Sequence, residues 1–164
     1  MLTNNIDFKN FKINKNTKKV KKILKKQLYE DNEVIRSLRK TYKNSYHKKL
    51  VTKYNKATNY RIIGMGGSTL GAQTIYDFLR KKIKKKFLFI DNLKAITKIN
   101  NEKKITNLVI SKSGNTIETI INTNLLVKKK HKNIFITENK KSYLYLLAEK
   151  LKAEIIDHNN YIGG

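Results

Sequence analysis

The sequence contains no cysteine, no proline and no tryptophan, and only 12 acidic residues stand against 37 lysines and arginines. The absence of cysteine excludes disulfide bonds and thiolate metal sites, and it fits a reducing compartment. No apolar run approaches the roughly 18 residues that a membrane-spanning helix needs. The N-terminal residues also lack the apolar core of a secretory signal. We therefore expect a soluble, cytoplasmic protein with no membrane partner.

The formal charge of +25 is carried mostly by lysine, because only four residues are arginine. Such a balance suggests nucleic acid or an anionic membrane as a partner. The lysine runs, however, are not interleaved with the aromatic residues that a single-strand site uses. Lysine, asparagine and isoleucine are residues of A- and T-rich codons, so base composition accounts for much of the charge. We expect no specific nucleic-acid partner, with nonspecific binding by the lysine surface as an alternative.

Apolar residues at spacings of three and four predict helices between Asn16 and about Tyr54, with Asn16 and Asn32 as N-caps. After Asn59, short apolar runs alternate with helix-length segments, which is typical of a parallel sheet with crossover helices. The chain is long enough for one ordinary domain. We expect a helical segment at residues 1–57 that packs on an α/β domain at residues 58–164.

We expect the fold class to be α/β, with a doubly wound, flavodoxin-like sheet of five parallel strands in the order 2-1-3-4-5, preceded by the N-terminal helices. The strands are predicted at residues 60–65, 87–91, 107–111, 133–137 and 154–157. The helices between them are predicted from apolar residues at Leu70, Ile75, Phe78 and Leu79, then Ala95, Ile96 and Ile99, then Ile117, Ile120, Ile121 and Leu125, then Leu144, Leu147 and Leu151.

Two loops rich in glycine and hydroxyl residues follow the first and third predicted strands. The first is GMGGSTLG at residues 64–71, and the second is SKSGNTIET at residues 111–119. In a 2-1-3-4-5 sheet these strands are neighbours, so the loops meet where ligands of this fold class bind. Helix N-termini present unpaired N–H groups and a positive dipole end, so the loops together predict a phosphate site.

Each loop also has a simpler structural interpretation. The first could be a tight turn in which Ser68 caps a helix, since its spacing breaks the dinucleotide fingerprint and no Walker lysine follows. The second could be a serine-rich turn with Asn115 or Thr116 as an ordinary N-cap. As an anion site, it would use Ser111, Lys112, Ser113 and Thr116, all within six residues.

The two strings, with VISKSGNTIET at residues 109–119, resemble the sugar isomerase (SIS) domain and most closely the glucose-6-phosphate isomerase family. The family's forms are GIGGSxLG and ISKxxxTxET, and the resemblance covers about residues 60–164. Thr69 departs from this pattern, because many members carry aspartate there. The chain stops after Gly163-Gly164, inside a segment that resembles the family's Gly-Gly-Arg motif. We therefore expect it to be the N-terminal portion of a longer polypeptide.

The resemblance implies interconversion of glucose 6-phosphate and fructose 6-phosphate through an enediol, in glycolysis and gluconeogenesis, without metal or organic cofactor. By match to the motifs, the second loop would hold the 6-phosphate with Ser111, Lys112, Ser113 and Thr116. The first loop would line the sugar side of the pocket with Gly67 and Ser68. Glu118 matches a carboxylate that orients the ring-opening histidine, although a solvated glutamate in the first helical turn is an equal interpretation.

The family's base glutamate and ring-opening histidine lie in segments that have no counterpart here, so the resemblance implies that this chain alone is inactive. The three histidines, His47, His131 and His158, match neither motif and are expected at the surface. The full-length protein is expected to be a homodimer. Two alternatives use the same loops: a bifunctional phosphoglucose/phosphomannose isomerase, and a noncatalytic regulator that senses sugar phosphates.

Overall fold

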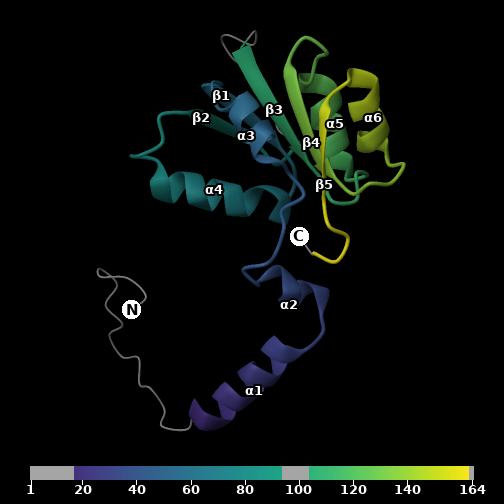
Figure 1. Ribbon diagram of the computed structural model, residues 1–164. Coiled ribbons are helices and arrows are strands. Elements are labelled where there is room, and N and C mark those ends of the chain that lie inside the picture. The colour runs from purple at the N-terminus through teal and green to yellow at the C-terminus, as the bar shows by residue number, and fades with distance from the viewer. Residues whose placement is uncertain (1–16, 94–103, 163–164) are drawn as a thin grey trace. The chain divides into compact units, whose positions relative to one another are not determined.

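The computed structural model describes residues 17–93 and 104–162 (Figure 1). The chain divides after Tyr42 into two compact units. The first unit contains α1 (Thr17–Tyr29) and α2 (Glu33–Ser37). Asn32 caps α2, because its Oδ1 accepts a hydrogen bond of 2.8 Å from the backbone N–H of Val34. This cap confirms the prediction for Asn32, while Asn16 lies outside the described residues.

The second unit is a five-stranded parallel sheet with helices on both faces. Its strands are β1 (Asn59–Ile63), β2 (Lys86–Ile90), β3 (Ile105–Ile110), β4 (Lys132–Thr137) and β5 (Glu154–Asp157). Their order is β2-β1-β3-β4-β5, so the predicted fold class and strand order are both confirmed. The predicted strands agree with the observed ones to within two residues, since short β-branched and aromatic runs suit a buried parallel strand.

Four helices of this unit are described: α3 (Lys48–Tyr54), α4 (Gly67–Leu79), α5 (Ile117–Leu126) and α6 (Tyr143–Leu151). The helix predicted between the second and third strands, with Ala95, Ile96 and Ile99, lies outside the described residues. α3 groups with the sheet and not with α1 and α2. The boundary expected between residues 57 and 58 stays a prediction.

The strand register shows which helices cover which face. Ile63, Val109 and Phe135 lie in one row across β1, β3 and β4, and they form the main core with buried residues of α5 and α6. Figure 1 shows α5 and α6 side by side along β4 and β5. On the other face, Tyr76 of α4 contacts the rings of Phe87 and Phe89 in β2. This two-sided cover follows from right-handed crossovers in opposite directions from β1 and β3.

A buried polar row lies on the same face as the main core, one pleat closer to the amino ends of the strands. Arg61, Asn107 and Asn133 are register partners on β1, β3 and β4, and each is at most 5% exposed. The side chain of Asn107 donates to Asn133 Oδ1 at 2.8 Å, and Arg61 donates to the carbonyl oxygen of Leu126 at 2.9 Å. The row thus ties the C-terminal end of α5 to three strands.

His131 extends this row and corrects a prediction. We expected all three histidines at the surface, but His131 is only 7% exposed. Its Nδ1 lies 3.3 Å from both the side-chain nitrogen of Asn107 and the backbone nitrogen of Lys128. Both neighbours are donors, so Nδ1 accepts and the ring proton sits on Nε2. The residue pattern around His131 did not predict its burial, because its partner Asn107 is 24 residues away in sequence.

Replacing Asn107 with leucine should destabilise the protein, because the new side chain keeps the volume but removes a buried donor and acceptor. We expect Asn107→Leu to lower the free energy of unfolding by roughly 3 kcal/mol, measured by urea denaturation. Asn160→Leu is the matched control, since Asn160 is exposed, and its effect should stay within about 0.5 kcal/mol. Equal effects of the two substitutions would show that the hydrogen bonds of the polar row do not contribute to the free energy of unfolding.

Candidate functional site

The loops that follow β1 and β3 meet at the carboxyl ends of these two neighbouring strands. Ile63, the last residue of β1, pairs with Val109 of β3. Gly64 then passes so close to the next strand that an added Cβ would lie 2.8 Å from the carbonyl oxygen of Ile110. Only glycine permits this approach. The predicted meeting of the two loops is therefore present in the structure.

The first loop turns directly into α4. Gly66 has φ of +53° and is the N-cap, and its carbonyl oxygen accepts a 3.0 Å hydrogen bond from the backbone N–H of Leu70. Gly67 and Ser68 are thus the first two helical residues, so the prediction of Ser68 as the N-cap was wrong. The glycine takes the cap because its positive φ brings the chain sharply into the helix. Both Gly67 and Ser68 remain accessible to solvent at the positive end of α4.

The second loop is a tight turn in front of α5. Ser111 is only 3% exposed, and its Oγ lies 3.1 Å from Thr116 Oγ1 and accepts from the backbone N–H of Gly114 at 3.2 Å. Thr116, one of the two predicted candidates, is the N-cap of α5, although its side chain makes no capping hydrogen bond. Ser113 lies on the outer, exposed side of the turn, where its Oγ accepts from Asn115 N–H at 3.2 Å. Of the four predicted phosphate ligands, the structure brings Ser111 and Thr116 into contact.

Lys112 turns towards Glu138, which follows β4. The Nζ of Lys112 lies 3.9 Å from one carboxylate oxygen of Glu138, and the Nζ of Lys140 lies 2.5 Å from the other. The hydrogen bond from Lys140 is the main reason why the pKa of Glu138 is below its ordinary value; Lys112 and His158 add to the effect. Lys112 is held loosely at this distance, so its ammonium group can reach a nearby anion at little cost.

The start of α6 closes over the second loop. Gly114 has φ of +67°, and an added Cβ would lie 2.6 Å from Ser142 Cβ and 2.9 Å from Thr137 Oγ1. The carbonyl oxygen of Gly114 accepts from Leu144 N–H, and Asn115 Oδ1 accepts from Tyr143 N–H, both at 3.0 Å. The loop is thus clasped between β4 and α6.

Sequence reasoning missed the contributions of Thr137 and Ser142. Ser142 precedes an apolar helical run, and its Oγ accepts from Tyr145 N–H at 3.4 Å, so its capping role could have been predicted from the sequence. Its contact with Gly114 could not be predicted, because the two residues are 28 positions apart.

Glu118 is half-buried in the first turn of α5, which is compatible both with an orienting carboxylate and with a glutamate that complements the helix dipole. Its role as an orienting carboxylate stays a prediction.

The described residues offer little to a metal ion, since they contain no cluster of three histidine, aspartate or glutamate side chains. The polar groups at the starts of α4 and α5 are hydroxyls and backbone N–H groups, and the ammonium group of Lys112 lies beside the second loop, turned towards Glu138. This set is chemically suited to an anion. In the part of the chain that the structure describes, we also find no helix with the length and apolarity to cross a membrane.

Comparison with curated proteins identifies relatives that share one name. The chain is 35% identical over 125 residues to a glucose-6-phosphate isomerase of Methanocaldococcus jannaschii, an alignment that covers 66% of this chain and 28% of that protein. It is 37% identical over 124 residues to the Acholeplasma laidlawii enzyme of the same name, with coverage of 63% and 29%. The resemblance predicted from the two motifs is therefore confirmed. No protein-family profile matches the chain.

Solved structures share the fold. A hypothetical protein from Thermus thermophilus superposes with a TM-score of 0.62 at 18% identity, covering 70% of this chain and 31% of that one. A tagatose-6-phosphate ketose/aldose isomerase from Escherichia coli gives a TM-score of 0.50 at 20% identity, covering 69% and 33%. The chain spans less than a third of the length of the two curated relatives above.

Substituting Gly114 should damage the second loop. Gly114→Ala adds a Cβ at a positive φ against Ser142 and Thr137, so we expect the free energy of unfolding to fall by about 2–4 kcal/mol in urea denaturation. The matched control is Gly71→Ala in α4, where no atom lies within 4 Å of the added Cβ. That change should raise stability by about 0.5–1 kcal/mol. Equal changes in the free energy of unfolding for Gly114→Ala and Gly71→Ala would contradict the close packing of the second loop against Ser142 and Thr137.

The charge of Glu138 should stabilise the fold in a pH-dependent way. Because its pKa falls on folding, the ionised carboxylate stabilises the native state above its ordinary pKa of 4.5, and this contribution is lost as the pH falls through the lowered folded value. Glu138→Gln should therefore be less stable than the parent at pH 7, and the two should converge in strong acid. Urea titrations at several pH values test this, with the exposed Glu149→Gln as control. A stability difference that does not change with pH would exclude the ionic interaction.

Proposed function

We propose that this chain provides the phosphosugar-binding part of an aldose–ketose isomerase that interconverts glucose 6-phosphate and fructose 6-phosphate. The observation that carries the proposal is that two hydroxyl- and glycine-rich loops start side by side, where Gly64 of the first loop closely approaches Ile110, the residue before the second. The names of the sequence relatives support the choice of substrate. Since those relatives are about three times as long, the activity of the whole protein is itself part of the proposal.

The phosphate group would bind in the second loop. Ser111 and Thr116 would donate from their hydroxyls, Ser113 would close the outer side, and the N-terminus of α5 would supply backbone N–H groups and its positive dipole end. Lys112 would swing from Glu138 to the phosphate and make a charge-assisted hydrogen bond. A phosphate dianion would then be matched by one full positive charge and several aligned dipoles.

The sugar would extend towards the first loop. Gly67 and Ser68 lie at the start of α4, and Gly64 fixes that loop against the end of β3. Glycine at position 67 leaves room for the sugar to approach the backbone, and the Ser68 hydroxyl can donate to or accept from a sugar hydroxyl. The two loops would thereby set the distance between the phosphate and the reacting carbons of one ligand.

Isomerisation moves a proton between C1 and C2 through an enediol, so it needs a base near both carbons and an acid for ring opening. The residues proposed here hold the phosphate and do not transfer that proton. Glu118 would act only by orienting the ring-opening group of the complete enzyme. Ordinary acid–base chemistry suffices for this reaction, so the proposal includes no metal or organic cofactor.

The complete protein would act in glycolysis and gluconeogenesis, in the cytoplasm and as a homodimer, as the family resemblance implies. The second loop has the form SKSGNT, which other sugar isomerase domains also carry. Activity towards mannose 6-phosphate, as in a bifunctional phosphoglucose/phosphomannose isomerase, is therefore the alternative within the same class. Titration with mannose 6-phosphate beside fructose 6-phosphate distinguishes the two.

Lys112 provides the direct test of the pocket. We expect fructose 6-phosphate to bind the chain in isothermal titration calorimetry, and Lys112→Ala to weaken that binding by about tenfold or more, since a charge-assisted hydrogen bond is lost. Lys141→Ala is the matched control, because Lys141 is exposed nearby but lies outside the motif, and its affinity should change less than about twofold. Equal affinities for the parent and Lys112→Ala, or no binding by the parent, would contradict the assignment.

A further inference from the structure

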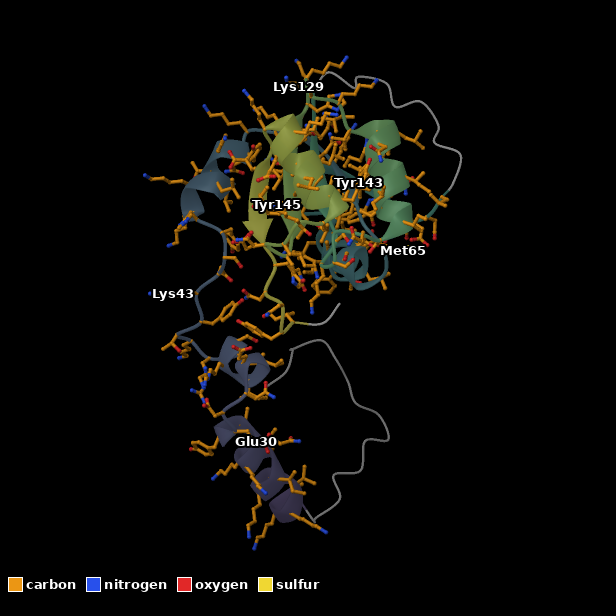
Figure 2. The ribbon with its side chains drawn as sticks, turned by 90° about the vertical axis from the view of Figure 1, so that its right-hand side faces the viewer. Glu30, Lys43, Met65, Lys129, Tyr143 and Tyr145 are labelled. Atoms are coloured by element: carbon orange, nitrogen blue, oxygen red, sulfur yellow. The ribbon has the colours of Figure 1, made fainter. Side chains whose placement is uncertain are left out.

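A second pocket opens at the opposite end of the sheet, where β1, β3 and β4 begin. It has a volume of about 300 Å³. Four lysines line it, from the segments that lead into β1 and β3 and from the start of β4, and none of its described lining residues is acidic. The lining residues are Lys56, Ala57, Thr58, Lys104, Ile105, Thr106, Lys130 and Lys132. Figure 2 shows Lys129, which precedes the lining residue Lys130, and Met65 of the first loop at opposite ends of the sheet.

The floor of the pocket is fixed by the sheet. Ile105 and Thr106 are the first residues of β3, and they are 6% and 1% exposed. The four lysines are exposed and rise around this floor from the ends of neighbouring strands. The concave shape therefore comes from the backbone of the sheet, and the charge comes from side chains that remain free to contact a ligand.

The loop that carries Lys56 is held in place by hydrogen bonds from Lys85 and Lys86. Lys85 Nζ donates to the carbonyl oxygen of Ala57 at 2.8 Å and also to that of Asn55, and the backbone N–H of Lys86 donates to Thr58 O at 2.8 Å. The ammonium group of Lys85 is thus hydrogen-bonded to the carbonyl oxygens of Asn55 and Ala57. Because these acceptors are already bonded, the loop presents mainly positive charge to the pocket.

The turn that carries Lys130 is anchored by the buried polar row. Asn133 Nδ2 donates to the carbonyl oxygen of Lys128 at 3.0 Å, and the backbone N–H of Lys128 donates to His131 Nδ1. The backbone N–H of His131 also donates to the carbonyl oxygen of Lys128, at 3.0 Å, and closes the turn. Buried polar groups thus fix the backbone beneath the lysines. A frame of this kind reduces the entropy that a ligand must remove when it binds.

The chemistry of the pocket defines its ligand. Four like charges around one hollow repel each other, and an anion with several charges would relieve that repulsion. No aromatic ring lies among the described lining residues, so the stacking that single-stranded nucleic acid requires is not provided. The volume lies at the lower end of the range for small-molecule sites, roughly 300–1,000 Å³. Both facts favour a short, highly charged molecule over a nucleic-acid strand.

We propose that the lysine pocket at the amino ends of β1, β3 and β4 binds a short polyphosphate chain. The chemistry is that of a triphosphate, either free or as the tail of a nucleotide. This inference is independent of the proposed isomerase activity, because it uses the other end of the sheet and none of the residues of the two loops.

Calorimetric titration of the full chain with tripolyphosphate at low salt tests the pocket. Lys130→Gln combined with Lys132→Gln should weaken binding by about tenfold or more, because two charge-assisted contacts are lost. The matched control combines Lys81→Gln with Lys82→Gln, two exposed lysines after α4 that do not line the pocket, and affinity should change less than about twofold. Thermal melting monitored by circular dichroism verifies that both double variants are folded.

Two further ligands test whether the phosphate chain alone is recognised. ATP should bind within a few-fold of tripolyphosphate, since only its phosphates are recognised, and an oligouridylate should bind more weakly than tripolyphosphate. Equal losses in the two double variants would attribute binding to net charge alone and overturn the proposal. A strong preference for ATP or for the oligouridylate, removed by the Lys130 and Lys132 substitutions, would overturn the assignment to a polyphosphate chain.

Discussion

The close approach of Gly64 to the carbonyl oxygen of Ile110 is the constraint on which the candidate site depends. It follows from two independent features, the neighbouring positions of β1 and β3 and the absence of a side chain where β1 ends. If either feature changed, the starts of α4 and α5 would move apart. Two helix N-termini that face one space create a region of positive potential without any charged residue. Lys112 adds a mobile charge to a field that the backbone has already set.

Much of this arrangement could be predicted because it is local in sequence. The strands follow from short apolar runs, their parallel arrangement from the alternation of strands and helices, and the loops from glycines and hydroxyls at strand ends. The strand order was predicted only as the common order of a doubly wound sheet. The errors involve contacts between distant residues. Ser68 was predicted as a cap from its type alone, whereas the backbone of Gly66 decides where α4 begins. The buried His131 contacts Asn107, which precedes it by 24 residues and lies on β3.

One face of the sheet carries two neighbouring rows with different physical roles. The apolar row, with Ile63, Val109 and Phe135, packs against α5 and α6, and its contribution is the burial of surface. The polar row, with Arg61 and Asn107, makes directional hydrogen bonds that only one register satisfies. A one-residue slip of any of these strands would turn that strand's members of both rows away from the helices. The apolar row therefore supplies stability, and the polar row specifies the alignment of β1, β3 and β4.

The clasp of the second loop by α6 also has a consequence for the order of folding. Gly114 and Asn115 receive their hydrogen bonds from Leu144 and Tyr143, at the far end of a β-strand and a turn. The chain from Ile117 to Thr137 must therefore be in place before the loop gains these bonds. Contacts across such sequence separations form late, because the entropy of closing the intervening chain must be lost first. The bonds that clasp the loop nearest to the proposed phosphate are thus expected to form after the helical hydrogen bonds of α5 and α6, which are local in sequence.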